Sequence, residues 1–284
     1  MQEIASEMSE STVPVFVVGS GRNGTRLIYK LMSGDPDIEI HHEYVCTHIQ
    51  QTAAEYFMGL ITHEQIKQRL KELHVAAIHY SSAYTWIDCS NKLSWVIGPL
   101  YELLPNAKFV HLTRDGRKVT SSFFHKLSAE IYDDESVGVL SAWINNRSLP
   151  KPPPEKKYWW NIPQEGQPFA EEFPNFDQFK RICYHWVEAV RVIREAFEEL
   201  PPAHHLTVKL EELTKDEALL KTFVEFIGAK YSESYCEFVQ RPQNVFFPMD
   251  FPLTDEELAI FNDMAGDTMK QLGYLEAEAY KVRY

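Results

Sequence analysis

The feature that most constrains this chain is the stretch VFVVGSGRNGTRLIYKLMSG at residues 15–34. Residues 15–18 form a continuous apolar run that predicts a buried strand, and apolar residues recur at the spacing of one helix face over residues 27–32. Three glycines lie between these two elements. Such a junction directs backbone N–H groups and the positive end of a helix toward one point, and glycine lets an anion approach the main chain. The stretch therefore predicts a strand–loop–helix unit that binds a phosphate-like group.

The residues of the loop narrow the kind of ligand. Gly19 and Gly24 have the spacing of a nucleotide phosphate loop, but Thr25 and Arg26 stand where the lysine and the metal-binding hydroxyl should follow. Arg22 and Arg26 instead supply two guanidinium groups that stay charged at working pH. The loop is P-loop-like and favours binding an anion without a metal. The alternative is an ordinary strand-to-helix turn.

Charge and its distribution restrict the partners further. The net charge is −13, which argues against nucleic acid because phosphate neutralisation needs a basic face. The basic residues nevertheless cluster at residues 22–30 and again at residues 108–118. Two basic clusters on an acidic chain favour a small anionic ligand over a polyanion.

Length and composition predict one large α/β domain. The 284 residues contain no run of about 18 apolar residues, and the first ten are acidic and polar, so we expect a soluble, cytoplasmic protein without a membrane partner. The four cysteines are far apart and form no CxxC pair, which argues against a zinc knuckle and a disulfide scaffold. We expect these residues in the core: Cys46, Cys89, Cys183 and Cys236.

The order of the predicted elements is that of repeated βα units around a mostly parallel sheet flanked by helices. A flexible acidic segment at residues 1–12 precedes a single domain at residues 13–284. Strands are predicted at residues 15–18, 38–43, 84–88, 108–114 and 205–210, and helices at residues 27–34, 62–79, 94–104, 116–127, 175–199, 214–228 and 254–272.

A proline-rich insertion is predicted at about residues 144–175. Its proline density excludes a helix or a central strand, and a strand that completes the sheet should follow it. We interpret it as a flap. Its aromatic residues Tyr158, Trp159 and Trp160 either anchor the flap to the domain or cover a pocket.

The second basic cluster lies in VHLTRDGRKVTSSFFHKL, residues 110–127. A strand ends near Arg114, which places this residue at the carboxyl edge of the sheet, where α/β proteins bind ligands. Ser122 follows eight residues later on the next helix. An arginine and a hydroxyl would make a site for a second phosphate, and the alternative is a capped helix with an exposed arginine.

Together the two clusters resemble two motifs of a known family. GSGRNGTRL is similar to the 5′-phosphosulfate loop of sulfotransferases, and RDGRKVTSS resembles their 3′-phosphate motif. Residues 90–117 are similar to the corresponding stretch of the tyrosylprotein sulfotransferases, and residues 206–228 resemble the family's late strand and helix. The resemblance covers roughly residues 13–272 and places the motifs nearest the tyrosylprotein and heparan branches.

The resemblance implies 3′-phosphoadenosine 5′-phosphosulfate (PAPS) as the donor and 3′-phosphoadenosine 5′-phosphate (PAP) as the product, with no metal. Negative charge builds up on the bridging oxygen of the leaving phosphate, so fixed cations and amide donors there stabilise the transition state. Leu210 stands where a tyrosine often contacts the nucleotide. The residues that match the loop are Arg22, Asn23, Gly24, Thr25 and Arg26, and those that match the 3′-phosphate contacts are Arg114 and Ser122.

Transfer to a hydroxyl or amine also needs a base. Glu43, in EIHHEYV, follows the second predicted strand, where enzymes of the tyrosylprotein and heparan types carry a catalytic glutamate. The neighbouring His41 and His42 are the rivals, and a solvated strand end without chemistry is the third possibility. Lys92 matches the family's lysine that reaches the sulfuryl group or the leaving oxygen. The candidate catalytic set is Glu43, Lys92, Arg22 and His42.

The acidic balance favours a neutral or cationic small molecule as the acceptor, and natural-product tailoring is one role that fits such an acceptor. A protein-tyrosine or carbohydrate sulfotransferase is the alternative within the family. Outside it, a P-loop kinase would need the missing lysine, and a non-catalytic nucleotide-binding protein would need no base. The sequence leaves O- versus N-sulfation open, and equally the choice between monomer and homodimer.

Overall fold

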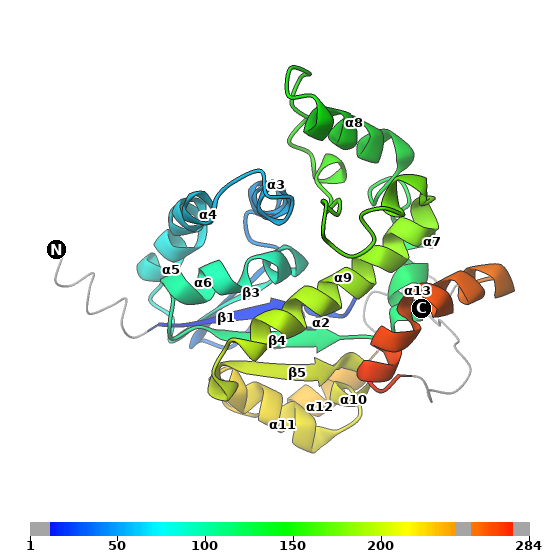
Figure 1. Ribbon diagram of the computed structural model, residues 1–284. Coiled ribbons are helices and arrows are strands. Elements are labelled where there is room, and N and C mark those ends of the chain that lie inside the picture. Colours follow the sequence, from blue (N-terminus) through cyan, green and yellow to red (C-terminus); the bar gives the residue numbers. More distant parts are fainter. Residues whose placement is uncertain (1–11, 242–250, 275–284) are drawn as a thin grey trace. The chain divides into compact units, whose positions relative to one another are not determined.

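The structure is a computed structural model and describes residues 12–241 and 251–274 (Figure 1). The predicted N-terminal segment 1–12 therefore lies outside the described residues, except for Thr12. Contacts divide the chain into two compact units. The first unit falls within Met1–Val45, Thr62–Arg114 and Val192–Gln243, and the second within Cys46–Ile61, Asp115–Arg191 and Asn244–Tyr284.

The first unit is built on a five-stranded sheet with the order β2-β3-β1-β4-β5. Every neighbouring pair is parallel, with Val17 opposite Cys89 on one side and Val110 on the other. The predicted α/β class and parallel sheet are confirmed. Parallel strands end at a common edge, so the loops that follow them meet there. The strands are β1 (Val13–Val18), β2 (Ile38–His42), β3 (Thr85–Cys89), β4 (Lys108–Thr113) and β5 (His205–Lys209).

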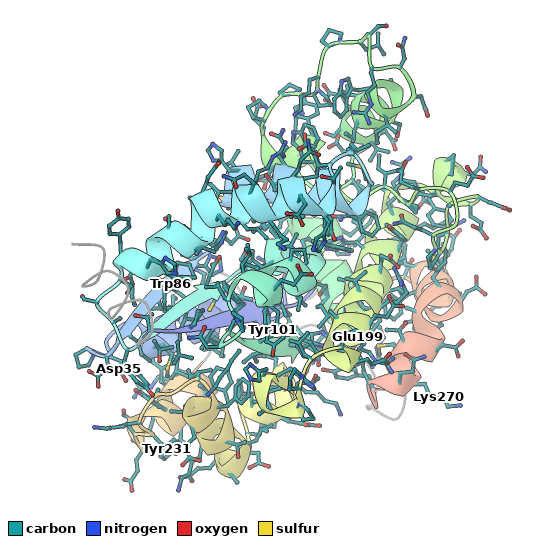
Figure 2. All side chains as sticks on the ribbon, turned by 60° about the vertical axis from the view of Figure 1, so that its left-hand side comes forward. Asp35, Trp86, Tyr101, Glu199, Tyr231 and Lys270 are labelled. Atoms are coloured by element: carbon teal, nitrogen blue, oxygen red, sulfur yellow. The ribbon has the colours of Figure 1, made fainter. Side chains whose placement is uncertain are left out.

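Alternating side chains of the strands face two helical layers. On one face, Val15 and Val17 belong to a buried cluster with α2, α11 and α12. On the other face, the ring of Phe16 lies 5.4 Å from that of Phe109, which in turn lies 6.5 Å from Tyr101 on α6 (Figure 2). The helices of this unit are α2 (Thr25–Met32), α4 (His63–Leu70), the π-helix η1 (Lys71–Val75), α5 (Ala76–Tyr80), the 3₁₀ helix η2 (Asn91–Trp95), α6 (Ile97–Leu103), the 3₁₀ helix η5 (Pro202–His204), α10 (Leu210–Leu213), α11 (Glu217–Phe226) and α12 (Ser234–Gln240).

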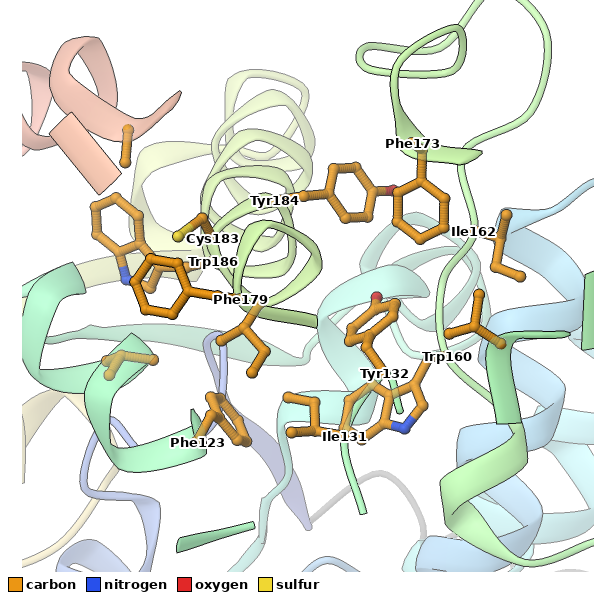
Figure 3. Close-up of a cluster of buried hydrophobic side chains, with 14 of the residues drawn as sticks. Phe123, Ile131, Tyr132, Trp160, Ile162, Phe173, Phe179, Cys183, Tyr184 and Trp186 are labelled. Carbon is orange, nitrogen blue, oxygen red and sulfur yellow. The ribbon is translucent and has the colours of Figure 1, made fainter. Parts of the chain in front are cut away.

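The second unit is helical and has its own aromatic core (Figure 3). Tyr132 is central to this core, since its ring lies 5.0 Å from Trp160 and 6.2 Å from Phe173. The long helix predicted at residues 175–199 is confirmed as α9, whereas α3, α8 and α12 were not predicted. The helices are α3 (Cys46–Phe57), α7 (Gly116–Lys126), α8 (Asp134–Asn145), the 3₁₀ helices η3 (Lys156–Tyr158) and η4 (Phe173–Asn175), α9 (Gln178–Glu198, which continues into the first unit) and α13 (Asp255–Gln271).

The proline-rich segment is anchored within the second unit by its tryptophans. Trp159 is 1% exposed in the core of this unit, and its carbonyl accepts from Nε2 of Gln50 on α3 at 2.8 Å. The Nε1–H of Trp160 donates to the carbonyl of Glu130 at 2.9 Å. These contacts anchor both tryptophans, and the interpretation of the segment as a flap stays a prediction.

The predicted placement of the cysteines is only half right. Cys89 and Cys183 are buried, but Cys46 and Cys236 are half-buried. Over the described ranges 12–241 and 251–274, no helix combines the length and the apolar composition needed to cross a bilayer.

Gly116 opens α7 at a position where a side chain has no room. A Cβ atom there would lie 2.7 Å from the rings of Trp186 and Phe261. We expect Gly116→Ala to lower the free energy of unfolding by about 1–3 kcal/mol, because overpacking displaces buried rings. Urea denaturation measures this. Gly138→Ala in α8 is the matched control, since nothing lies within 4 Å of its Cβ position, and it should stabilise by about 0.5–1 kcal/mol. Equal effects of the two substitutions would contradict this packing.

Candidate functional site

The loop between β1 and α2 needs its glycines for steric reasons. A Cβ atom on Gly19 would lie 2.6 Å from the carbonyl oxygen of Leu112. Gly24 is the N-cap of α2 with φ +102°, and a Cβ atom there would lie 2.7 Å from Leu210. A β-carbon on Gly19 would therefore push the loop away from β4, and one on Gly24 would meet the side chain of Leu210 at the start of α10 in addition to the strain of the positive φ. The predicted P-loop-like strand–loop–helix is confirmed.

The backbone of the loop enters the region of positive φ at several residues. Nests of successive N–H groups that bind anions use residues in this region. The side chain of Asn23 is fully buried and its amide donates to the carbonyl of Leu112. This side chain therefore ties the loop to β4, and any contact of Asn23 with an anion is left to its main chain. The residues with positive φ are Gly19, Gly21, Arg22 and Gly24.

The two basic clusters meet at this loop. Nη1 of Arg114, directly after β4, donates to the carbonyl of Arg22 at 2.9 Å. The chain leaves β1 toward β2 and leaves β4 toward β5, so this contact lies where the strand order changes direction, the usual ligand crevice of an open α/β sheet.

Ser122 belongs to the second unit, on α7, and its side chain is buried. Arg114 belongs to the first unit and is the last residue of its range Thr62–Arg114. The predicted pairing of Arg114 with Ser122 around one phosphate therefore stays a prediction. Asp115 caps α7 by accepting from the N–H of Arg117, whose guanidinium also donates to Asp115 at 2.6 Å. The predicted start of this helix is confirmed.

Ser94 fastens the loop from the side of β3. Its hydroxyl accepts from the N–H of Gly19 at 3.0 Å and donates to the carbonyl of Gly19 at 2.9 Å. Ser94 is 2% exposed and lies in η2, immediately after β3. No sequence pattern singles out this serine, because the contact spans 75 positions.

Two candidate catalytic residues form an ion pair. Nζ of Lys92 donates to Oε1 of Glu43 and, at 2.8 Å, to Oδ1 of Asn91. The side chain of Lys92 is 7% exposed and that of Glu43 is 24% exposed, so the carboxylate is the more accessible partner. Partial burial strengthens such a pair relative to an exposed one. The structure thus brings Glu43 and Lys92 together at the carboxyl edge of the sheet.

Glu43 lies in a strained turn. Its φ is +58° and that of Val45 is +43°, backbone angles that residues other than glycine rarely adopt. Each such residue costs about 1–3 kcal/mol and persists only when its surroundings fix it. The N–H of Glu43 donates to the carbonyl of Cys89 at 3.2 Å, which continues the pairing of β2 with β3.

The rival histidines take different environments. Nε2 of His42 lies 3.5 Å from Oγ1 of Thr25, at the start of α2, whereas His41 is paired with Glu39 at 2.9 Å. Burial lowers the pKa of His42, with the charges of Lys92 and Arg26 acting in the same direction and Glu43 opposing them. A neutral imidazole can accept a proton, so the structure keeps His42 as a chemical rival of Glu43.

An open cavity of about 510 Å³ adjoins this turn. It has the volume of a small-molecule site. Its lining residues come from α2, β2 and the turn after β2, and they are Arg26, Tyr29, Ile40, His41, His42 and Tyr44. Within the described residues, no group of three or more His, Cys, Asp or Glu side chains is arranged to hold a metal ion.

Comparison with known proteins finds a family match over part of the chain. Residues 14–146 match the model of the sulfotransferase family, and this range contains the loop, the Glu43 turn, Lys92 and both basic clusters. The predicted resemblance to this family is confirmed over that range, and the match supports sulfotransferase activity in general. No curated protein matches the sequence.

Solved sulfotransferases have a similar fold. STF9 from Mycobacterium avium is 12% identical with a TM-score of 0.51, over 95% of this chain and 80% of that one. The sulfotransferase of Alicyclobacillus acidocaldarius is 16% identical, with a TM-score of 0.47 over 91% and 95% of the chains. The sulfotransferase domain of the Synechococcus PCC 7002 olefin synthase is 14% identical, with a TM-score of 0.45 over 89% and 94%. At these identities the likeness to STF9 concerns the fold alone.

The opposing charges around His42 make its titration a test of the site. We expect its NMR titration midpoint below the ordinary value of about 6.5, because burial disfavours the imidazolium. Glu43→Gln should lower the midpoint further, since the carboxylate stabilises the imidazolium, and Lys92→Met should raise it.

Glu39→Gln is the matched control for this titration. Glu39 lies in β2, four residues before Glu43, and its partners are His41 and Ser81. It should leave the His42 midpoint unchanged. If Glu43→Gln and Lys92→Met shifted the midpoint in the same direction, the arrangement of charges described above would be wrong.

Proposed function

We propose that this protein transfers the sulfuryl group of PAPS to a hydroxyl or amine of a small molecule, without a metal. The observation that carries the proposal is the Glu43–Lys92 ion pair, held beside the anion-binding loop at one edge of the sheet. Ser94 connects the segment of Lys92 to Gly19, and Thr25 approaches His42, the residue before Glu43. The residues proposed as base and as cation are therefore linked by short contacts to the loop between β1 and α2.

The proposed roles follow from charge. Backbone N–H groups of residues 22–26 and the guanidinium groups of Arg22 and Arg26 bind the 5′-phosphosulfate. Arg114, with Ser122, binds the 3′-phosphate that distinguishes PAPS from ATP. Lys92 faces the oxygen on which negative charge develops when the donor is cleaved.

The proposed transfer is a single in-line displacement. The acceptor O–H or N–H gives its proton to the carboxylate of Glu43, and the acceptor atom forms a bond to sulfur. The bond from sulfur to the bridging oxygen breaks, and PAP leaves with the electron pair. Glu43 serves as the general base because a carboxylate can accept a proton and its side chain, 24% exposed, is accessible to an acceptor. His42 is the second candidate for this role.

The acceptor is proposed to be a neutral or cationic small molecule. A net charge of −13 disfavours polyanionic carbohydrates and acidic tyrosine peptides. The cavity of about 510 Å³ next to the Glu43 turn suits a molecule of modest size, and its Tyr29 and Tyr44 supply ring faces. A protein-tyrosine or carbohydrate sulfotransferase would instead prefer an acidic tyrosine peptide or a polyanionic carbohydrate over a small molecule as the acceptor.

Glu43→Gln tests the proposed role of the base. We expect turnover to fall by about 10²- to 10⁴-fold, with the Kd for PAP within about twofold of that of the wild type, because only proton transfer is removed. The assay follows PAP release from PAPS by chromatography, with 4-nitrophenol, a primary alcohol, a primary amine and an acidic tyrosine peptide as acceptors. Glu39→Gln is the matched control and should keep its activity.

Three outcomes would contradict parts of this assignment. Wild-type turnover in Glu43→Gln, together with its loss in His42→Asn, would transfer the role of base to His42. Turnover on the acidic peptide alone would overturn the small-molecule acceptor. Tight binding of PAP with no turnover on any acceptor would favour a non-catalytic nucleotide-binding protein.

A further inference from the structure

Asp88 is a buried carboxylate that the proposed reaction does not use. It lies on β3 and is 0% exposed. Burying a carboxylate is unfavourable unless its oxygens are hydrogen-bonded or paired. Here one oxygen, Oδ1, accepts from the backbone N–H of Tyr44 at 3.1 Å, and the other, Oδ2, lies 3.3 Å from Nε2 of His74. Both oxygens are thus occupied, and one of them holds the residue next to Glu43.

The two β3 residues Asp88 and Cys89 hold consecutive amides of the Glu43 turn. The N–H of Glu43 donates to the carbonyl of Cys89, and the N–H of Tyr44 donates to Asp88. The turn needs such support because the backbone at Glu43 and at Val45 has positive φ. The contact with Asp88 falls between these two strained residues, where it can fix the direction of the Glu43 side chain.

His74 holds Asp88 from the opposite side. It is 0% exposed and lies in η1, a π-helical turn between α4 and α5. Such turns are rare and often occur at functional sites. Its ring lies 5.5 Å from that of Tyr44 and 6.1 Å from that of Trp86. His74 therefore contacts both ends of the hydrogen bond between Asp88 and Tyr44.

We propose that Asp88, supported by His74, is a positioning residue that holds the Glu43 turn so that the carboxylate of Glu43 meets Lys92. This inference rests on the proposed function, because positioning matters for turnover only if Glu43 acts as the base. Asp88 itself makes no contact with the donor or the acceptor in this role. The same segment then holds the Glu43 turn twice, at the Tyr44 backbone through Asp88 and at the Glu43 side chain through Lys92.

A double-mutant cycle of Asp88 with Glu43 separates positioning from general stability. We expect Asp88→Ala to lower kcat by about 10- to 100-fold, the size of effect that misplacing a catalytic group produces. The KM for PAPS should change less than about twofold. In the Glu43→Gln background the same substitution should cost less than about twofold further, because there is no longer a base to misplace.

Two further variants complete the kinetic test. Asp88→Asn should restore most of kcat, since its Oδ1 still accepts from Tyr44. Thr85→Val is the matched control, because Thr85 is on the same strand, equally buried, and its hydroxyl has no hydrogen-bond partner among the described residues. Equal losses from Asp88→Ala in the wild-type and Glu43→Gln backgrounds would overturn the proposal.

Hydrogen exchange of the Tyr44 amide, measured by NMR, tests the positioning without any turnover. Exchange should accelerate at least about tenfold in Asp88→Ala and stay unchanged in Thr85→Val. An unchanged Tyr44 amide in Asp88→Ala would overturn the proposal whatever the kinetics show. A wild-type protein that lacks turnover on every acceptor, but whose Tyr44 amide loses protection in Asp88→Ala, would contradict the proposed enzyme and keep Asp88 as the residue that holds this turn.

Discussion

The segment from Asp88 to Ser94, at the end of β3, is the constraint on which the site depends. It holds the Glu43 turn through Asp88 and Cys89, binds the Glu43 carboxylate through Lys92, and fastens the loop through Ser94. β3 is buried along its whole length between β1 and β2. Because the interior of a sheet is rigid, groups attached to this segment keep their spacing before any ligand binds, which is what electrostatic catalysis requires.

The charges of the site follow from the same topology. Parallel strands end at one edge, so a loop after β1, a carboxylate after β2, a lysine after β3 and an arginine after β4 converge although they are far apart in the sequence. The cations come from three different strand ends, and Glu43 brings a negative charge among them. An acidic chain can therefore present a local binding site for an anion while its remaining surface repels polyanions.

The sequence was sufficient to predict those helices and strands that have a strong local pattern. The apolar run before Gly19 predicted β1, the helical spacing over residues 175–199 predicted α9, and the strand ends predicted that Glu43 and Arg114 lie at the sheet edge. The contacts of Ser94 with Gly19 and of Asp88 with Tyr44 were out of reach, because they join residues distant in the sequence and depend on positive φ at Glu43. Helices α3 and α8 were missed since their buried faces include small and polar residues such as Ala53, Thr52 and Ser136.

Calorimetric titration with PAP in the presence of EDTA measures whether the two basic clusters form one site for a 3′-phosphorylated nucleotide. We expect PAP to bind to the protein and ATP not to bind. We also expect Arg114→Ala to weaken the binding of PAP by at least about tenfold, because a charge-assisted contact to phosphate is lost. Arg117→Ala, whose guanidinium is bound to Asp115, should bind as the wild type does. Binding of ATP that requires Mg²⁺, or PAP affinity unchanged in Arg114→Ala, would contradict the account.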